Sequence, residues 1–570
     1  MSRKWKIKPK YNQEFEEKFP KINGVVLQLL YNRGLKTQEE IDQFLAPDYL
    51  KDQHDPFLFN DMTKAVGRIF ESISKKERIV VYGDYDADGV TSTSLLYSAL
   101  KRVGVSDLGI YIPDRMKEGY GLKESAIKEI AKQGTKLIIT VDCGISGKKE
   151  IDLAVELGMD VIITDHHQEP TELPDKAYAM IVPTLKKEKY PFQYLAGVGV
   201  AFKLAQALLR KDKSQDNEAY EKWLLDLLAL GTVADCVPLM GENRTLVKWG
   251  LLVLNKTQRL GLKELISRAS IRKEIDTRTI GFQIAPRINA AGRMDHANTA
   301  FELLTTEDEA ESLAISIDLN QKNQNRQKVT EVMMKISLEQ IGEPKGDDVI
   351  LFSTYDGWSP GMVGLAAGKL ADKFSRPVIV FGKMGDKYVG SGRSIEEFDI
   401  TKALGECKEY LAEFGGHAQA CGLTILGKKN HIDFMDKITK IAKKKLKDVE
   451  LIPSIDIEVE MRLNGLNWDL IENLEKFEPF GEGNKKPKFL SENLEVMDFF
   501  TMGGNNQHIR LLLRDESNGD AEKFVGFSMA EWKNKIKEGD RVDIVYEVGV
   551  NEWNGSREIE CRIKDIKNKE

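Results

Sequence analysis

Acidic side chains stand directly after three short apolar runs in the first third of the sequence. VVYG leads into GDYDADG, IITV into DCG and VIIT into DHH, which gives Asp84, Asp86, Asp88, Asp142, Asp165, His166 and His167. A fourth segment, GTVADCVP, adds Asp235 before a proline. Gathered carboxylates repel one another unless cations neutralise them, and oxygen-rich ligand sets with an imidazole suit Mn²⁺ or Mg²⁺. Enough ligands for two ions are present, and two such ions can activate water for an in-line phosphoryl displacement.

Each acid taken alone has a simpler explanation. An aspartate after a strand is commonly a turn former or an N-cap, and this applies to Asp84 or Asp165 by itself. GDYDADG resembles the start of an EF-hand loop, but it follows an apolar run and lacks the later glutamate that such a loop needs. The chain has no GxxxxGK[ST] loop. The four segments together favour metal-assisted phosphoester hydrolysis.

The elements that must position these acids follow one pattern from residue 77 to residue 167. RIVVYG, LGIYIP, TKLIITV and MDVIIT are apolar runs. They are separated by amphipathic stretches of about 12 residues, a spacing typical of βαβ units. In such folds the carboxyl ends of parallel strands meet at one edge of the sheet, where ligands bind. The pattern therefore predicts an α/β fold with a parallel sheet on which the acids converge.

The rest of the chain divides into further domains. Helical patterns dominate from Gly197 to Leu260, and a polar stretch from Glu307 to Glu339 predicts a long connecting helix. A second α/β unit has strands near DDVILFS, RPVIVFG and KYVGSGR, and a glycine-rich turn at FGGHAQACG. After Pro453, alternating runs such as RVDIVYEVG and REIECRI predict an all-β tail, most simply a small barrel. This tail resembles an OB-like barrel. We expect an N-terminal segment (1–70), a parallel-sheet domain (71–300), a connecting helix (301–345), a smaller α/β domain (346–450) and a β-barrel domain (451–570).

Composition excludes several classes of protein. The 570 residues are 41% hydrophobic and 30% charged, with a mean hydropathy of −0.36, as in globular multidomain proteins. No apolar run approaches the roughly 18 residues of a membrane span, and no apolar stretch follows MSRKWKIKPK, so we expect neither a membrane protein nor an export signal. The five cysteines form no CxxC pair, which excludes a cysteine zinc site and fits a reducing cytoplasm.

The net charge of −7 is unevenly distributed. Residues 451–570 carry a formal charge of −8, whereas residues 1–450 carry +1. Phosphate binding depends on clustered lysine and arginine, so overall charge does not identify a nucleic-acid binder. Either the β-rich tail has a local positive groove or it contributes little to the binding of any nucleic acid. The residues available for such a groove are Lys485, Lys486, Lys488, Arg510 and Arg514.

The motifs GDYDADG, VDCG, DHH and ADCVP, in this order, resemble the four motifs of the DHH phosphoesterase family. FGGHAQACG is similar to the GGH motif of the companion DHHA1 domain. APRINAAGRM, LNQKNQNRQ, GSGRS and FEPFGEGNKKPKF extend the resemblance over about residues 20–570. Within the family, the chain is most similar to the bacterial single-strand-specific 5′-to-3′ exonucleases.

The resemblance implies two ions of Mn²⁺ or Mg²⁺, with Asp142 as the bridge between them. It implies further ligands at Asp86, Asp88, His166 and Asp235. Asp84 and His167 are nearby, either as ligands or as groups that support them. Relatives that hydrolyse small phosphates have a histidine four residues before the acid that corresponds to Asp86, where this chain has Tyr82. That departure leaves one metal with fewer ligands, and Asp84 could compensate.

The resemblance also implies substrate-binding groups. Arg115, in YIPDRMKEGYG, and Ser391 with Arg393, in GSGRS, match positions that cradle a 5′-phosphate. His417, in the GGH motif, is expected to contact the scissile phosphate from the second domain. Without the resemblance, a surface ion pair would be the simpler interpretation of each arginine, and a structural role the simpler one for the histidine. The same cleft is expected to be lined by Arg287, Asn289 and Arg293.

The function that the resemblance implies is two-metal hydrolysis of the terminal phosphodiester of single-stranded DNA in repair and recombination. Catalytic roles would fall to Asp142, His166, His167 and His417. A helicase and a single-strand-binding protein are candidate partners besides the DNA. One alternative is a hydrolase of short oligonucleotides or cyclic dinucleotides, against which the N-terminal segment, long helix and β-rich tail argue. The other is a non-catalytic single-strand-binding scaffold, against which the intact acids argue.

Overall fold

The computed structural model describes residues 3–212, 216–515, 521–553 and 555–569. Its contacts divide the chain into two compact units. The first contains residues 1–53, 238–248 and 454–570, and the second contains residues 54–237 and 249–453. No helix in the described ranges is both long enough and apolar enough to cross a membrane.

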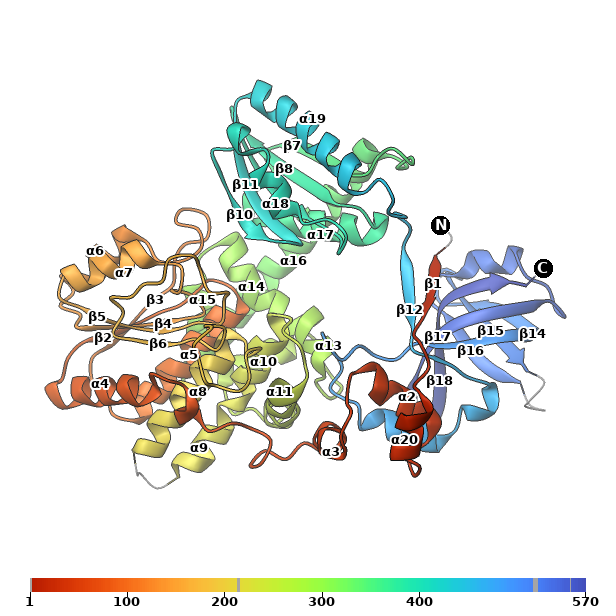
Figure 1. The fold of residues 1–570 in the computed structure, drawn as a ribbon, viewed down its shortest axis with the longest axis horizontal. Coiled ribbons are helices and arrows are strands. Elements are labelled where there is room, and N and C mark those ends of the chain that lie inside the picture. Colours follow the sequence, from red (N-terminus) through yellow and green to blue (C-terminus); the bar gives the residue numbers. More distant parts are fainter. Residues whose placement is uncertain (1–2, 213–215, 516–520, 554, 570) are drawn as a thin grey trace. The chain divides into compact units, whose positions relative to one another are not determined.

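The second unit contains the five-stranded parallel sheet that the apolar runs predict. Its strands are arranged in the order β3-β2-β4-β5-β6. Helices α6 (Glu124–Lys132) and α7 (Lys148–Glu156) cover one face, and α4 (Met62–Lys75), α5 (Ala87–Arg102) and α8 (Gly197–Lys211) lie on the other side (Figure 1). The strands are β2 (Ile79–Tyr82), β3 (Leu108–Tyr111), β4 (Leu137–Val141), β5 (Asp160–Thr164) and β6 (Ala179–Ile181).

Burial explains why the apolar runs form central strands. Every residue of β2 and β4 is buried, as expected for strands covered on both faces. Strand β2 pairs with β3 on one side and with β4 on the other. The chain runs from β2 to β3 and then crosses over to β4, so the direction of the strand order reverses at β2. Such a switch point opens a crevice beyond the carboxyl ends of the strands. The acids that follow β2 and β4 are placed at this crevice.

Helices follow the sheet as the sequence pattern indicates. They are α9 (Asn217–Trp223), α10 (Leu225–Ala234), α11 (Gly241–Leu254), α12 (Leu260–Arg268), α13 (Thr277–Thr279), α14 (Ala285–Met294) and α15 (Asn298–Thr305). A π-helical turn at Ile280–Ile284, which the sequence did not predict, joins α13 to α14. The long connecting helix is α16 (Glu309–Ile341), and the side chain of Asp308 caps its first turn.

A second sheet follows α16, with strand order β10-β11-β9-β8-β7. Helices α17 (Pro360–Phe374), α18 (Ile400–Gly405) and α19 (Lys428–Lys445) accompany it. The strands are β7 (Leu351–Asp356), β8 (Val378–Met384), β9 (Lys387–Arg393), β10 (Glu413–His417) and β11 (Ala420–Leu426). The glycine-rich segment FGGHAQACG was expected to be a turn, but it is a β-hairpin in which Gly415 and Gly416 lie within β10. Gly416 has a φ of 142°, and a Cβ at this position would clash with the backbone of Ala420. The strand therefore requires glycine here to pair with β11.

The first unit contains the expected barrel. Strands β14, β15, β16, β18 and β17 pair in turn, and β17 pairs back to β14 to close the sheet. The 14-residue strand β14 (Phe489–Met502) was not among the runs that the sequence analysis identified. The other strands are β15 (His508–Arg514), β16 (Glu522–Gly526), β17 (Arg541–Trp553) and β18 (Ser556–Asn568), with β13 (Val459–Glu460) beside β14.

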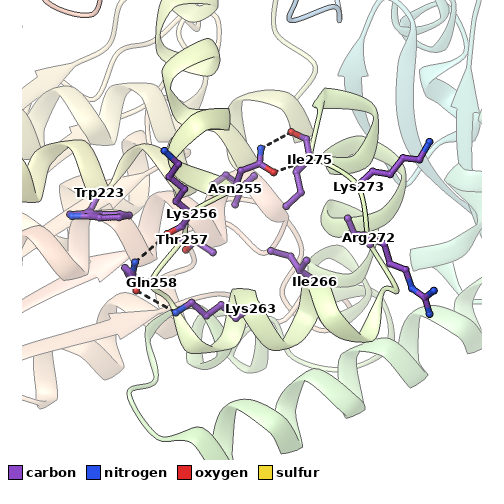
Figure 2. A pocket seen from close by; sticks show the side chains of 12 residues that line it. Trp223, Asn255, Lys256, Thr257, Gln258, Lys263, Ile266, Arg272, Lys273 and Ile275 are labelled. Carbon is purple, nitrogen blue, oxygen red and sulfur yellow. Dashed lines mark hydrogen bonds between the residues drawn. The ribbon is translucent and has the colours of Figure 1, made fainter. Parts of the chain in front are cut away.

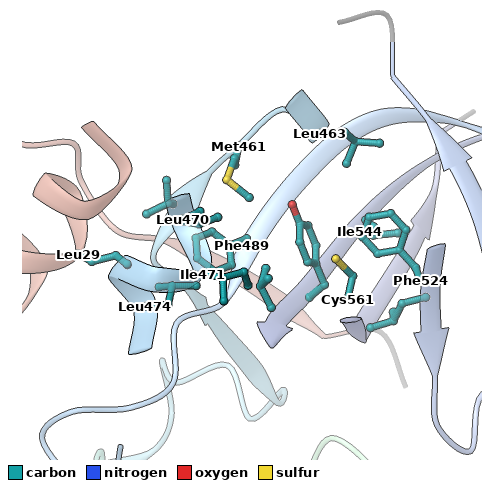
Figure 3. Close-up of a cluster of buried hydrophobic side chains, with 14 of the residues drawn as sticks. Leu29, Met461, Leu463, Leu470, Ile471, Leu474, Phe489, Phe524, Ile544 and Cys561 are labelled. Atoms are coloured by element: carbon teal, nitrogen blue, oxygen red, sulfur yellow. The ribbon is translucent and has the colours of Figure 1, made fainter. Parts of the chain in front are cut away.

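N-terminal elements belong to the same unit as the barrel. Strand β1 (Lys4–Ile7) pairs in parallel with β12 (Ser454–Ile457). Helices α1 (Gln13–Lys18), α2 (Gly24–Asn32) and α3 (Gln38–Leu45) share one hydrophobic core with α20 (Trp468–Glu475) and the barrel strands (Figure 3). Figure 3 shows Leu29 of α2 beside Leu474 of α20 in this core.

The buried Arg244 ties three segments of the first unit together. Its guanidinium lies over the Phe44 ring, 3.9 Å from the centroid, and donates to the carbonyl of Phe44. It also donates to the carbonyls of residues 476–479. Every hydrogen-bond acceptor of Arg244 named above is a backbone oxygen. Its position therefore depends on how the three segments fold together.

Candidate metal centre and arginine cluster

The strand tips bring the predicted acids into one cluster. Asp84 follows β2, Asp142 follows β4, the DHH segment follows β5, and Asp235 caps the C-terminus of α10. Three groups have ligand atoms within 4.8 Å of one another: Asp88, His166 and Asp235; Asp84, Asp86 and Asp142; and Asp142, His166 and His167.

One group surrounds the His166 imidazole. Its Nε2 lies 3.1 Å from Asp142 Oδ1, 3.7 Å from Asp235 Oδ2 and 4.0 Å from Asp88 Oδ2. Asp88 is fixed from behind, because its two oxygens accept the backbone N–H groups of Gly197 and Val198 at 2.7 and 2.9 Å. These N–H groups begin α8, and a helix N-terminus favours a negative charge. Three carboxylates and one imidazole of this kind suit a divalent cation such as Mn²⁺ or Mg²⁺.

The second group contains carboxylates alone. Asp84, Asp86 and Asp142 face one another, so Asp142 belongs to both groups. The Oδ1 atom of Asp84 is buried and has no hydrogen-bond partner in the described part of the chain. An unpaired buried carboxylate oxygen is costly unless a cation binds it, so these residues fit a second metal ion.

The electrostatics of the cluster favour a bound cation. Burial, together with neighbouring carboxylates, raises the pKa of Asp235 to about 9 and that of Asp88 to about 7. Burial and the surrounding acids hold the pKa of Asp142 well above its ordinary value. Burial, followed by the charge of His167, lowers the pKa of His166 to about 4, so its imidazole is neutral and able to bind a metal. The carboxylates can all ionise together only if positive charge enters the cluster.

Asp165 holds the DHH segment in place. It is fully buried and accepts the backbone N–H groups of Ile145, His166 and His167 at 2.7 to 3.1 Å. It also lies 2.7 Å from His167 Nδ1. Burial opposes charge on both side chains, but their pairing outweighs it, lowering the pKa of Asp165 and raising that of His167. The hydroxyl of Tyr120, 3.1 Å from His167 Nδ1, adds a further contact.

Backbone geometry at Asp142 leaves little freedom. Asp142 has a φ of 58°, a left-handed conformation that non-glycine residues adopt at a cost. Gly197 packs against it so closely that a Cβ there would lie 2.6 Å from Asp142 Oδ1. The carboxylate shared by both groups is therefore held by its own backbone and by the start of α8.

Arginines gather beside the acids. Burial and the neighbouring Arg115, Arg326 and Arg393 together lower the pKa of Arg293 to about 9. Arg115 lies over the ring of Tyr85, and Arg293 donates to the carbonyl of Gly361 at 2.8 Å. None of these four arginines forms an ion pair with an acid within the described ranges. The cluster therefore has positive charge available for an anionic ligand.

Ser391 and Arg393 lie together on β9. The Arg393 guanidinium donates to Ser391 Oγ at 3.0 Å, and Ser391 Oγ donates to the carbonyl of Cys421 at 3.1 Å. Gly364, in the first turns of α17, is so close that a Cβ there would lie 3.1 Å from Ser391 Oγ and 3.3 Å from Arg393 Nη2. A hydroxyl and a guanidinium next to one another suit a phosphate group.

The remaining predicted residues have different surroundings. The amide oxygen of Asn289 accepts the N–H of Ala87 at 2.9 Å, which ties α14 to the metal-ligand loop. Arg287 donates to Asn320 of α16 and to the carbonyl of Gln283. His417 is exposed on β10 and belongs to none of the ligand groups found in the described residues.

Sequence reasoning did not single out Tyr120, Arg326 or Gly197. Tyr120 and Arg326 lie within DRMKEGYG and LNQKNQNRQ, which were noted for resemblance alone. Gly197 and Gly199 form no dinucleotide-binding motif, because the preceding strand and the third glycine of that motif are missing. No sequence signal links any of these residues to the acids, because the contacts span distant parts of the chain.

In the first unit, the candidate tail cations Lys485, Lys486, Lys488, Arg510 and Arg514 have mixed surroundings. Arg514 pairs with Glu495 at 2.9 Å, and burial lowers the pKa of Lys486. Arg510 lies over the exposed ring of Phe500, 5.2 Å from the centroid. The charge of Arg514 is therefore partly neutralised and that of Lys486 is partly buried, whereas Arg510 lies beside an exposed aromatic ring.

A separate pocket of about 690 Å³ lies around the loops on either side of α12 in the second unit (Figure 2). Its amide groups bond within the chain: Asn255 donates to the carbonyl of Ile275 at 3.0 Å and accepts its N–H at 2.8 Å. None of the lining residues is an acid, a histidine or a cysteine. The pocket therefore lacks the groups that phosphoester hydrolysis requires.

Three segments of the chain match known families. Residues 78–232 match the DHH family, N-terminal domain; residues 347–446 match the DHHA1 domain; and residues 457–565 match the RecJ OB domain. These segments correspond to the parallel-sheet domain, the second α/β domain and the barrel.

Whole-chain relatives carry one name. The chain is 41% identical over 550 residues to the single-stranded-DNA-specific exonuclease RecJ of Bacillus subtilis (strain 168), covering 95% of this chain and 68% of that protein. It is 31% identical over 566 residues to the protein of the same name from Haemophilus influenzae, covering 95% and 96%. The crystal structure of RecJ in complex with Mn²⁺ from Thermus thermophilus matches with a TM-score of 0.83 and 25% identity, covering 100% of this chain and 80% of that chain.

Proposed function

Because the chain belongs to the RecJ family of single-stranded-DNA-specific exonucleases, we propose that it digests single-stranded DNA from the 5′ end and releases 5′-mononucleotides. The observation that carries this proposal is the position of the arginine cluster beside the acidic cluster. An acidic centre that binds cations can cleave a phosphodiester, and an adjacent anion pocket can hold the terminal phosphate. Together they favour cleavage at a phosphorylated end.

The chain would bind two divalent cations, Mn²⁺ or Mg²⁺. Relatives of known structure were crystallised with these two metals. Asp88, Asp142, His166 and Asp235 would hold one ion, and Asp84, Asp86 and Asp142 the other. When bound, two such ions activate water and stabilise the attacking and leaving oxygens of the displacement. The unpaired oxygen of Asp84 and the raised pKa of Asp142 support this assignment.

The 5′-phosphate would dock on Arg115, Ser391 and Arg393. The bond between the next phosphorus and the 3′-oxygen of the terminal nucleotide would then break, so a 5′-mononucleotide leaves and the shortened strand keeps a 5′-phosphate for the next cycle. The mutual proximity of these arginines, which form no ion pair within the described part of the chain, supports the docking site. Arg293 would add positive charge to the same pocket.

The histidines would have separate roles. His166 would be a metal ligand, whereas His167, held by Asp165 and Tyr120, would support the ligand set or join it beside Asp142. His417 would contact the scissile phosphate from the second domain, a role that its exposed position on β10 permits. Arg287 and Asn289 would act from α14, where Asn289 already fixes the metal-ligand loop.

We extend the proposal to the setting of the enzyme. None of the five cysteines, all of which the structure describes, forms a disulfide, which supports a reducing cytoplasm. A helicase or a single-strand-binding protein would expose the strand during repair and recombination. The chain would divide its work among an N-terminal segment, two catalytic domains, a connecting helix and a barrel.

End-labelled DNA tests the proposal. A single strand labelled at its 5′ end should release labelled mononucleotide at once in the presence of Mn²⁺, whereas 3′-labelled and duplex controls should not. Asp142→Ala should abolish release, and the matched variant Asp372→Ala, at an exposed aspartate of α17, should retain it. Early release from the 3′ end would overturn the proposed polarity.

A further inference from the structure

Phe282 is an exposed aromatic side chain on the helix that carries Asn289 and Arg293. Its exposed fraction is 77%, and its neighbours Gly281 and Gln283 are exposed as well. Ile280 and Ile284, on either side, are buried. The phenyl ring therefore projects away from the core of its own unit, where it makes no contribution to packing that would explain an aromatic residue.

The backbone at Phe282 departs from a regular helix. Residues 280–284 form a π-helical turn, in which the N–H of Ala285 bonds the carbonyl of Ile280. Pro286 has no N–H to give to the carbonyl of Phe282, its partner in a regular α-helix, so the wider turn is favoured. Arg287 holds the turn from outside by donating to the carbonyl of Gln283. Single π-turns of this kind are common at functional sites.

A series of mutually repelling guanidinium groups extends from this turn, where Arg287 bonds the carbonyl of Gln283, to the arginine cluster. Arg293 is close to Arg115, Arg393 and Arg326, and Arg287 is close to Arg326 in turn. Among the described residues, the guanidinium groups of Arg287, Arg293 and Arg326 bond only neutral oxygens. Their positive charge is therefore available to phosphates along the path from the 5′-phosphate pocket to the π-turn.

Phe282 is next to Gln283, whose carbonyl accepts from Arg287, so it lies at the Arg287 end of that series. Asn289 bonds the metal-ligand loop. It lies seven positions after Phe282, which corresponds to a helical rise of roughly 10 Å. A single strand fixed at its 5′-phosphate would therefore reach Phe282 a few nucleotides beyond the scissile bond. Proteins that bind single strands pair a cationic track for the backbone with aromatic side chains on which bases stack.

We propose that Phe282 is a stacking platform for a base of the incoming strand, a few nucleotides downstream of the scissile phosphate. The inference rests on the proposed function, since it takes single-stranded DNA as the substrate. A duplex would keep its bases stacked on one another and would gain nothing from the platform. Phe282 would thus contribute to the preference for single strands as well as to affinity.

Three variants and two substrates test the platform. Phe282→Ala should raise KM about 10-fold on a 5′-phosphorylated single strand of about 20 nucleotides. It should leave hydrolysis of a 5′-phosphorylated dinucleotide unchanged, because that substrate ends before the platform. Phe282→Trp should stay near wild type, and Phe282→Leu should resemble the alanine variant, because leucine keeps bulk but has no ring.

Abasic nucleotides locate the contact. In wild type, one abasic position among the second to fifth nucleotides should weaken binding as much as Phe282→Ala does, and that position should have no further effect in the variant. Equal losses on the long strand and the dinucleotide would overturn the platform, as would full activity of Phe282→Leu. Binding of a labelled strand without metal separates the two proposals. Wild type that binds the strand without metal but never cleaves it once Mn²⁺ is added would refute the proposed function, whereas equal affinities of wild type and Phe282→Ala would refute the platform alone.

Discussion

Replacing Gly197 with alanine tests how the metal centre is held together. The new Cβ would lie 2.6 Å from both Cβ and Oδ1 of Asp142. Carbon atoms favour separations of about 3.5–4.0 Å, so the Asp142 carboxylate would have to withdraw by about 1 Å. Its backbone, at a φ of 58°, has little freedom to follow. Since Asp142 belongs to both ligand groups, the displacement would disturb both cation sites.

The size of the effect follows from that displacement. A misplacement of about 1 Å in a catalytic constellation costs about 100-fold in rate, or ~2.7 kcal/mol of transition-state stabilisation. Metal–ligand distances tolerate only about 0.2 Å, so affinity for Mn²⁺ should fall as well. Folding should be preserved, because alanine favours the first turn of α8 at least as well as glycine does. The variant should therefore be folded, deficient in metal and slow.

The assay combines turnover, calorimetry and melting. We expect kcat/KM on 5′-phosphorylated single-stranded DNA to fall about 100-fold, Mn²⁺ titration to show weakened binding, and the Tm to fall only slightly, because overpacking a buried site costs about 1–3 kcal/mol. Gly199→Ala, on the same helix, is the matched control, because its Cβ would meet only the flexible side chain of Leu195, at 3.3 Å. If Gly197→Ala bound Mn²⁺ and cleaved DNA like the control, Asp142 would not be positioned as the structure indicates.

Three other substitutions probe different parts of the chain. Arg393→Gln should raise KM for 5′-phosphorylated ends about 10-fold and leave unphosphorylated ends nearly unaffected, since one charge-assisted contact is lost; equal losses on both ends would contradict the docking site. Arg244→Met should lower the free energy of unfolding of the first unit by about 3–5 kcal/mol in urea titrations, because buried carbonyls lose their donor; an unchanged midpoint would be inconsistent with that role. Burial lowers the pKa of His431 to about 4, so its neutral form contributes stability above about pH 6.5 that is lost as pH falls through 4. His431→Phe should remove up to about 3 kcal/mol of this acid sensitivity, measured by denaturation at pH 7 and pH 4, and identical pH profiles would refute the assignment.

Local sequence patterns predicted the regular strands and helices, but they did not predict where these elements depart from regular geometry. The Val/Ile-rich runs became buried parallel strands, because a run covered on both faces needs no alternation. The polar stretch after residue 307 became α16. The π-turn before Pro286 and the strand character of Gly415 and Gly416 escaped prediction, since both depend on hydrogen bonds that the pattern does not specify.

By itself, the sequence determined the chemistry available to this protein: acids after parallel strands, the order of the four motifs, and the arginines of DRMKEGYG and GSGRS. Only the tertiary structure decided which side chains share a ligand group, that Asp165 orients its neighbours, and that Gly197 confines Asp142. It also joined Arg326 to the arginine cluster and left Phe282 exposed. The physical reason is that residue type and periodicity are local properties, whereas burial, charge pairing and close packing arise between segments far apart in the chain.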